Sequence, residues 1–260
     1  MFKLTVLGNN GPFPAKGGAC SGYLLQYEDT SVLLDFGSGS MANLASVLSY
    51  DLEDIDAIIL THLHADHISD ISVLRYAVFR TNNATDRDGR ELRIPLYCPS
   101  APQLEYDVLC SYDKFEVIPL SEELTVEING LTLNFSPMQH PYPVFAVSAE
   151  AEGRKFIYTG DTSWNQNLIQ FSEGADLMLA DANLISQDRL AGKPIFHLTA
   201  EECGIAAAEA GATRLLLTHF TPGSDIGRRV AEAKAGAQKV LGRSDSLIVE
   251  DAQILTSYEI

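Results

Sequence analysis

Three of the six histidines in this 260-residue chain stand in one hexapeptide, His62-Leu63-His64-Ala65-Asp66-His67. The apolar run before it predicts a buried strand over Ala57–Leu60, and a helix is expected to follow it. His62 and His64 are two residues apart, so on extended backbone both side chains point to the same side. Asp66 lies where the helix should begin, and the helix dipole favours an ionised carboxylate there. Neutral imidazole and carboxylate groups are metal ligands, so this spacing indicates a metal site.

Three further candidate ligands each follow a predicted strand. They are His140, Asp161 and His219. Taken singly, such residues are more often surface histidines or turn aspartates. Their shared position at strand ends, together with the hexapeptide, favours a metal centre instead. A ligand set of nitrogen and oxygen donors without thiolate fits zinc, and manganese or iron also fit.

The elements that must position these residues are strand runs first and strand–helix alternation later. Short β-branched or aromatic runs between turn residues predict strands over Phe2–Leu7, Gly22–Tyr27, Ser31–Asp35, Ala57–Leu60, Leu96–Cys98, Leu124–Ile128, Leu131–Phe135, Val144–Ala149, Lys155–Tyr158, Leu177–Ala180, Leu215–Leu217 and Ser246–Ile248. Helices are predicted over Ser40–Leu48, Ile68–Phe79, Pro102–Ser111, Trp164–Phe171, Ala200–Ala210 and Ser224–Val240. Two sets of strands flanked by helices indicate two sheets with helices outside. The polar segment Arg80–Arg93 is predicted to be a solvated loop that could contact substrate or another subunit.

The pattern His62-x-His64-x-Asp66-His67, followed in order by His140, Asp161 and His219, resembles the signature of the metallo-β-lactamase fold superfamily. The resemblance covers almost the whole chain and implies an α/β (α+β) fold, a four-layer αββα sandwich formed by one domain over residues 1–260. It also implies two divalent metal ions. One would be bound by His62, His64 and His140, the other by Asp66, His67 and His219, and Asp161 would bridge them.

The segment around His197 resembles the C-terminal part of ribonuclease Z and its small phosphodiesterase-like relatives. His197 directly precedes a helix that starts with the capping box Thr199-Ala200-Glu201-Glu202. The resemblance implies that His197 protonates the leaving oxygen, a task that suits the pKa of histidine. Asp181 matches the acidic residue that pairs with this histidine, although the family more often has glutamate there. The alternative is that His197 only flanks the helix as a capping residue.

The resemblance implies hydrolysis of a phosphodiester bond in a small or nucleotide-like substrate by attack of a metal-bound hydroxide, which Asp66 would orient or whose proton it would accept. The alternative within this branch is tRNA 3′-end processing by ribonuclease Z. That enzyme carries a basic arm between the equivalents of His140 and Asp161, whereas here the interval is only 21 residues and one hairpin fills it. A non-catalytic metal-binding scaffold or sensor is an alternative from another class. Hydrolysis of β-lactams is less favoured than either.

The formal net charge is −17, and two divalent cations would leave it strongly negative. Long nucleic acids are held chiefly by Lys and Arg, so the balance disfavours them. A small anionic substrate remains compatible because the metal ions dominate the local field. The chain has no apolar run long enough for a membrane span and no signal-peptide pattern, and its four cysteines are widely spaced. We therefore expect a cytoplasmic protein, and the resemblance further implies a homodimer.

Overall fold

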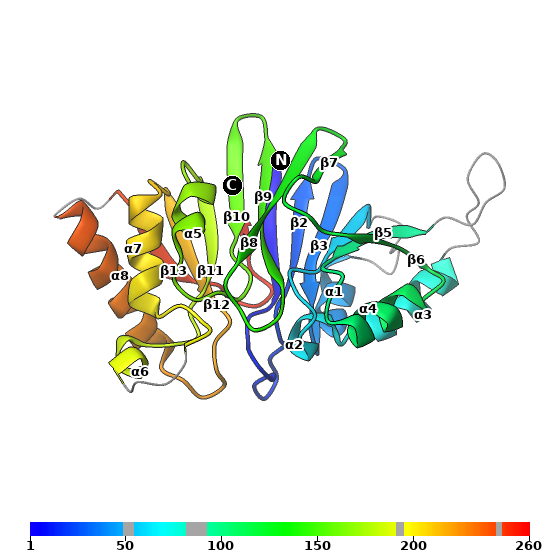
Figure 1. The fold of residues 1–260 in the computed structure, drawn as a ribbon, viewed down its shortest axis with the longest axis horizontal. Helices are drawn as coiled ribbons and strands as arrows, with labels where there is room; N and C mark the ends of the chain where they lie inside the picture. Colours follow the sequence, from blue (N-terminus) through cyan, green and yellow to red (C-terminus); the bar gives the residue numbers. More distant parts are fainter. Residues whose placement is uncertain (49–54, 82–92, 191–194, 243–245) are drawn as a thin grey trace. The chain divides into compact units, whose positions relative to one another are not determined.

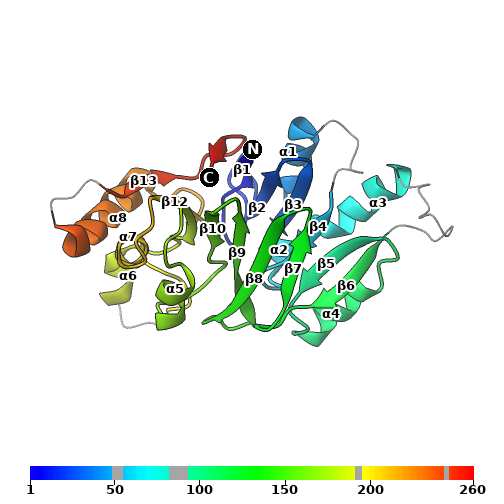
Figure 2. The same ribbon diagram turned by 90° about the horizontal axis from the view of Figure 1, so that it is seen from above.

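The structure, a computed structural model, describes residues 1–48, 55–81, 93–190, 195–242 and 246–260. Its contacts divide the chain into two compact units, Met1–Leu120 with Ile254–Glu259, and Ser121–Gln253 with Ile260. Each unit contains one seven-stranded sheet, and most of the strands are labelled in Figure 2. The single domain predicted over residues 1–260 stays a prediction.

The sheet of the first unit has the strand order β14-β1-β2-β3-β4-β5-β6. Its strands are β1 (Phe2–Gly8), β2 (Gly22–Tyr27), β3 (Thr30–Phe36), β4 (Ala57–Ile59), β5 (Ile94–Cys98), β6 (Phe115–Pro119) and β14 (Ser257–Glu259). Its helices are α1 (Ser40–Val47), α2 (Ala65–Ile68), α3 (Ile71–Thr81) and α4 (Gln103–Cys110). The pairing is antiparallel from β14 to β3 and parallel from β3 to β6. Every residue of β3 and β4 is buried, as expected for apolar strands in a parallel arrangement.

The sheet of the second unit has the strand order β13-β12-β11-β10-β9-β8-β7. Its strands are β7 (Thr125–Ile128), β8 (Leu131–Met138), β9 (Val144–Ala151), β10 (Arg154–Tyr158), β11 (Leu177–Asp181), β12 (Arg214–Thr218) and β13 (Ile248–Asp251). Its helices are α5 (Gln166–Phe171), α6 (Ser186–Leu190), α7 (Ala200–Glu209) and α8 (Ile226–Leu241). Strands β7 to β10 pair antiparallel and β10 to β13 pair parallel. Figure 1 shows this sheet with its helices α7 and α8.

The parallel strands explain where the chemistry gathers within each unit. The carboxyl ends of parallel strands lie at one edge of a sheet, and ligands of open α/β sheets bind outside that edge. In the first unit, the hexapeptide that begins at His62 follows β4. In the second unit, Asp161 follows β10, Asp181 ends β11 and His219 follows β12.

Most predicted elements are present, and a few boundaries are wrong. The helix predicted over Ile68–Phe79 is α3, which begins at Ile71, and Ala65–Ile68 form the separate short helix α2. Asp70 lies between them, and its carboxylate accepts hydrogen bonds of 2.9 Å from the backbone N–H groups of Gly39 and Met41. The strand predicted over Ser246–Ile248 is β13, which begins at Ile248. Strands β6 and β14 and helix α6 were not predicted. The loop predicted over Arg80–Arg93 is helical up to Thr81, and residues 82–92 lie outside the described residues.

One hairpin fills the interval between His140 and Asp161, as predicted. It consists of β9 and β10, which are joined by Glu152 and Gly153 in left-handed conformations. Within the described ranges, no helix is long and apolar enough to cross a membrane.

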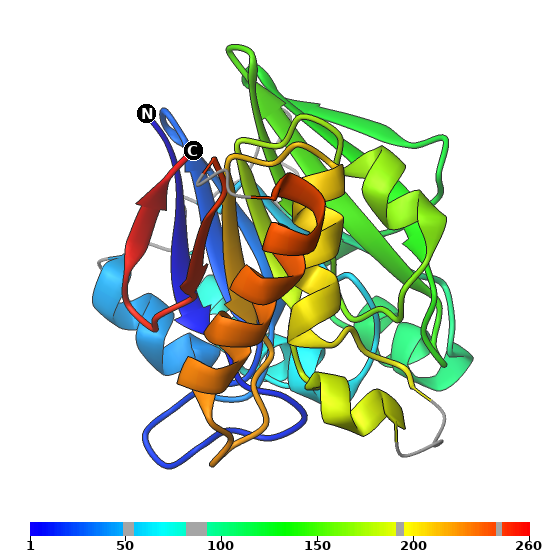
Figure 3. The same cartoon turned by 90° about the vertical axis from the view of Figure 1, so that its left-hand side faces the viewer.

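Helices α7 and α8 pack closely because each presents a glycine to the backbone of the other. Figure 3 shows the two helices side by side in front of the sheet. A Cβ atom at Gly204 would lie 1.9 Å from the carbonyl oxygen of Ala233, and one at Gly236 would lie 2.1 Å from that of Glu201. A carbonyl cannot move aside as a flexible side chain can, so any larger residue must push the helices apart.

The substitution Gly204→Ala is therefore expected to lower the free energy of unfolding by about 1–3 kcal/mol, the usual cost of overpacking. Gly227 offers a matched control in α8, because a Cβ atom there would meet nothing closer than 3.5 Å. Gly227→Ala should raise stability by about 0.5–1 kcal/mol, since alanine loses less conformational freedom than glycine in a helix. Urea denaturation of both variants measures the two effects, and equal effects would refute the packing explanation.

Candidate metal and catalytic centre

In the first unit the hexapeptide leaves a buried strand and enters a short helix, as expected. After β4 the backbone is extended at His64 (φ −67°, ψ 147°), and α2 begins at the next residue. Nε2 of His62 lies 3.0 Å from Nδ1 of His64, and the rings of His62 and His67 are 4.1 Å apart between centroids. His62, Asp66 and His67 are buried. Three imidazoles and one carboxylate are thus held together in the first unit.

Asp35, at the end of β3, is a member of this cluster that the sequence did not reveal. It is fully buried and has a left-handed backbone (φ 51°). Its Oδ1 accepts a hydrogen bond of 2.7 Å from the backbone N–H of Thr61, and its Oδ2 accepts one of 2.8 Å from the Thr61 hydroxyl. Oδ2 also lies 2.7 Å from Nδ1 of His67. Because a carboxylate only accepts, Nδ1 of His67 carries the hydrogen and Nε2 is left with its lone pair.

A close backbone contact fixes where α2 begins. A Cβ atom at Gly37 would lie 1.8 Å from the carbonyl oxygen of Asp66. Glycine is therefore required at this position after β3, because any side chain would displace the start of α2. The position of Asp66 thus depends on a residue 29 positions earlier in the chain.

In the second unit, His140 follows β8 and is half-buried. Its Nδ1 lies 3.0 Å from the backbone carbonyl oxygen of Phe196, which can only accept a hydrogen bond. Nε2 is therefore again the nitrogen that carries no hydrogen in the neutral ring. Burial lowers the pKa of His140 from its ordinary value despite the opposing charge of Asp161. The neutral ring that a metal ion needs is therefore favoured.

Asp161 and His219 meet at the ends of β10 and β12. Oδ2 of Asp161 lies 3.3 Å from Nε2 of His219, and both residues are 2% exposed. His219 has a left-handed backbone (φ 59°), which is unfavourable for a residue with a β-carbon. The Asn183 side-chain amide donates a hydrogen bond of 3.0 Å to the His219 carbonyl and so supports this conformation. Strained backbone of this kind is typical of functional sites.

His197 and Asp181 form a hydrogen-bonded pair, with 2.8 Å between Nδ1 and Oδ2. Asp181 is 1% exposed, whereas the His197 side chain is 24% exposed and can be reached from solvent. Burial alone would lower the pKa of His197 and raise that of Asp181. Their mutual attraction outweighs burial, so the pKa of His197 is raised and the pKa of Asp181 is lowered. The pairing expected between these residues is present.

The donors of both units fit divalent metal ions in their chemistry. Within the second unit, donor atoms of Asp161, Asp181, His197 and His219 all lie within 4.8 Å of one another. Nδ1 of His67 is held by a carboxylate and Nδ1 of His140 by a carbonyl, which leaves Nε2 of each ring as the candidate ligand. Orientation of a ligand histidine through its other nitrogen is the usual arrangement around a protein-bound metal.

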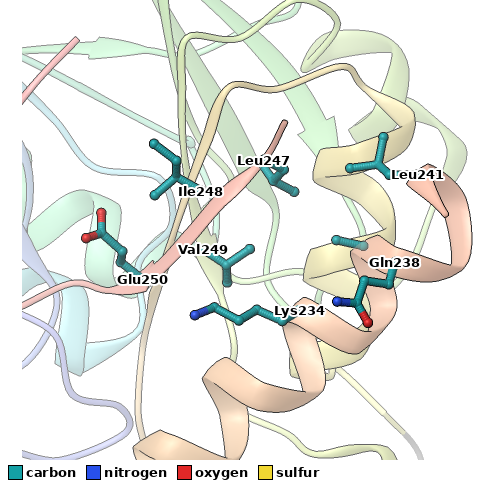
Figure 4. A pocket seen from close by; sticks show the side chains of 8 residues that line it. Lys234, Gln238, Leu241, Leu247, Ile248, Val249 and Glu250 are labelled. Carbon is teal, nitrogen blue, oxygen red and sulfur yellow. The ribbon is translucent and has the colours of Figure 1, made fainter. Parts of the chain in front are cut away.

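One groove of the second unit lies apart from this chemistry. It has a volume of about 370 Å³ and runs between α8 and β13, where Lys234, Gln238, Leu241, Leu247, Val249 and Glu250 line it (Figure 4). None of the predicted ligands or catalytic residues lines this groove. The groove therefore does not indicate a different location for the candidate site.

Known proteins with similar sequences support the interpretation of these residues as a metal-dependent hydrolase site. The Beta-lactamase superfamily domain matches residues 30–220. The probable metallo-hydrolase YhfI of Bacillus subtilis (strain 168) is 32% identical over 219 residues, which are 84% of this chain and 87% of that protein. A ribonuclease Z of Ignicoccus hospitalis is 24% identical over 281 residues, covering 89% of this chain and 92% of that protein.

Solved structures agree with the sequence matches. The crystal structure of the metallo-beta-lactamase fold protein YhfI from Bacillus subtilis has a TM-score of 0.82 at 29% identity, covering 99% of this chain and 98% of that chain. A diphosphatase from the PhnP family has a TM-score of 0.73 at 20% identity, covering 100% and 98%. These matches confirm the predicted mixed α/β fold of the metallo-β-lactamase type. The chain belongs to the beta-lactamase superfamily.

Proposed function

We propose that this protein is a hydrolase that uses two divalent metal ions to cleave a phosphodiester bond in a small or nucleotide-like substrate. The observation that carries the proposal is the His197–Asp181 pair, with its 2.8 Å hydrogen bond. Asp181 fixes the ring so that its other nitrogen, Nε2, is left to exchange a proton with a substrate. An oriented, partly exposed histidine with a raised pKa suits a general acid that protonates a leaving oxygen.

The metal ligands in this proposal are the seven that the family resemblance implies. His62, His64 and His140 would hold one ion, Asp66, His67 and His219 would hold the other, and Asp161 would belong to both ligand sets. Zinc is the preferred ion, because the donors are nitrogen and oxygen and the ligand histidines are held in defined orientations. When bound, two such ions lower the pKa of a coordinated water and stabilise negative charge on phosphate oxygens.

The protein's own groups have three tasks in this reaction. Asp66, 8% exposed and with Oδ2 3.6 Å from Nε2 of His67, is placed to accept a proton or orient a water molecule. Asp35 and Thr61 keep His67 in one orientation through their hydrogen bonds. His197 supplies the proton at the leaving oxygen. The barrier falls because these groups are held in place before the substrate arrives.

Two observations favour a small substrate over tRNA. The β9–β10 hairpin fills the interval in which ribonuclease Z carries its basic arm, and the net charge of the chain is −17. An acidic protein without such an arm is poorly suited to bind a long polyanion, because Lys and Arg supply most of the binding to phosphates. The similarity of fold to a diphosphatase from the PhnP family, at 20% identity, is compatible with hydrolysis at phosphate. The similarity to ribonuclease Z keeps tRNA processing as the second candidate.

A substrate comparison tests this function. The zinc- or manganese-loaded protein is expected to hydrolyse bis-p-nitrophenyl phosphate, and a chelator should abolish the activity. Precursor tRNA should remain uncut under the same conditions. Cleavage at the tRNA 3′ end would favour the ribonuclease Z alternative. Lack of turnover on cyclic nucleotides, cyclic phosphates, short RNA and both test substrates, with metals bound, would favour a binding scaffold or sensor.

We also propose that the protein is a cytoplasmic homodimer. The widely spaced cysteines support a reducing compartment, and all four are free in the structure. Closed two-fold dimers are the commonest soluble oligomers, and the family resemblance points the same way. Light scattering on the purified protein should give twice the chain mass of 28.3 kDa.

A further inference from the structure

Arg229 is a buried cation in α8 that binds main-chain oxygens. Its side chain is on the inner side of the helix and is only 6% exposed. Nε donates a hydrogen bond of 2.9 Å to the carbonyl of Ala182, and Nη2 donates one of 2.6 Å to the carbonyl of Asn183. A third donor, Nη1, lies 3.4 Å from the carbonyl of Asp225, the N-cap residue of α8. Two consecutive carbonyls are thus held by the planar fork of one guanidinium.

These carbonyls belong to the segment that directly follows β11. The carbonyl before them, that of Asp181, accepts a hydrogen bond of 3.1 Å from the thiol of Cys203 in α7. Three successive carbonyls are therefore fixed by side chains from two helices. A segment held in this way has little conformational freedom, because each carbonyl would have to lose a hydrogen-bond donor in order to move.

The same segment contains the groups that orient His197 and His219. The Asn183 backbone N–H donates to Oδ1 of Asp181 at 3.0 Å, while Oδ2 of Asp181 binds His197. The Asn183 side-chain amide donates to the His219 carbonyl at 3.0 Å and supports its left-handed backbone. A shift of this segment would therefore displace Asp181, the partner of His197, and at the same time loosen the backbone of His219.

We propose that Arg229 is a positioning residue that sets the acid pair and the His219 ligand through the segment 181–183. This inference rests on the proposed function. Arg229 touches neither the substrate nor the reacting atoms in this role, because its donors reach main-chain oxygens behind the site. Arginine is suited to the task, since lysine cannot span two carbonyls with a rigid fork.

The variant Arg229→Met removes the donors and keeps an apolar chain in the same space. Removing the outer partners of a metal ligand typically costs about 10–100-fold in metal affinity or activity. We expect zinc affinity, measured by competition with a chromophoric chelator, to fall by about tenfold or more on that basis. At saturating zinc, kcat should fall strongly for a dinucleotide, whose alkoxide leaving group needs a proton. It should fall far less for bis-p-nitrophenyl phosphate, because nitrophenolate leaves without one.

Arg228 provides the matched control on the same helix. It is exposed and pairs with Glu232 at 2.9 Å, so Arg228→Met loses one charge at the neighbouring position and removes none of the hydrogen bonds of Arg229 to the carbonyls of Ala182 and Asn183. This control should keep wild-type zinc affinity and wild-type kcat on both substrates. Arg229→Lys keeps the charge and can reach one carbonyl, so it should recover part of both properties. If Arg229→Met does not fold, the lysine variant is measured by the same two readouts.

The outcomes separate this inference from the proposed function. Equal losses of kcat on both substrates at saturating zinc, or zinc affinity and kcat equal to those of the Arg228→Met control, would overturn the role of Arg229. If the wild-type protein hydrolyses neither substrate, the proposed function fails. The chelator competition then tests Arg229 by itself, and a tenfold weaker zinc affinity still supports it while an unchanged affinity overturns it.

Discussion

Replacing Asp161 by alanine is expected to remove metal and activity together, with a loss of about 10³-fold or more in kcat. The side chain is 2% exposed, and its Oδ2 lies 3.3 Å from Nε2 of His219. If this carboxylate contacts both ions, its removal loosens both, and bound metal supplies several kcal/mol of stabilisation to a phosphoryl transition state, or about 10³-fold in rate. Metal content per chain by plasma mass spectrometry and kcat on bis-p-nitrophenyl phosphate measure the two effects.

Asp107 gives a suitable control for that experiment. It lies on α4, exposed, with a 2.7 Å hydrogen bond from Gln103 as its side-chain contact in the structure. Asp107→Ala should keep both metals and the wild-type rate. An Asp161→Ala protein that retained two ions per chain and ordinary turnover would show that the carboxylate at the end of β10 is not a ligand.

The variant His197→Ala should keep its metals and lose turnover where the leaving oxygen needs a proton. General acids contribute about 10²–10⁴-fold, so kcat on a dinucleotide should fall within that range. On bis-p-nitrophenyl phosphate the loss should be much smaller, which makes this substrate an internal control for folding and metal content. Asp181→Asn should show the same selectivity with a smaller loss, because the His197 ring remains but loses the carboxylate that orients it. Equal losses on both substrates, or loss of metal, would argue against the acid assignment.

The sequence allowed the candidate site to be recognised because its residues occur where strands end. A parallel strand brings the residue at its carboxyl end to one edge of the sheet, where Asp161, Asp181 and His219 lie, and the family resemblance predicted their roles. The capping box before α7 likewise predicted where His197 stands, and the structure contains both of its hydrogen bonds. A ligand motif together with further candidate ligands at strand ends indicates the site specifically, whereas either feature alone does not.

Other parts of the site could not be predicted, because their role depends on contacts between distant residues. Asp35 ends an apolar run like many strand-terminal aspartates, and only the fold brings it to His67, 32 positions later. Arg229 belongs to an amphipathic helix, where arginine is usually exposed as Arg228 is. No local pattern distinguishes the two arginines, and only the packing of α8 does.

The missed elements have similar physical reasons. Strand β14 has three residues at the edge of its sheet, and its pairing with β1 joins the two ends of the chain. Strand β6 ends in Pro119, a residue that normally argues against a strand but is tolerated at an edge position. The break between α2 and α3 is hidden because the apolar residues Ile68 and Ile71 keep helical spacing across it.

The most direct measurement of the central claim is the anomalous scattering of crystals grown with zinc. Two peaks a few ångströms apart are expected, the first bound by His62, His64 and His140, the second by Asp66, His67 and His219, and both by Asp161. A single peak, or two peaks with His140 or His219 turned away from them, would contradict the dinuclear hydrolase.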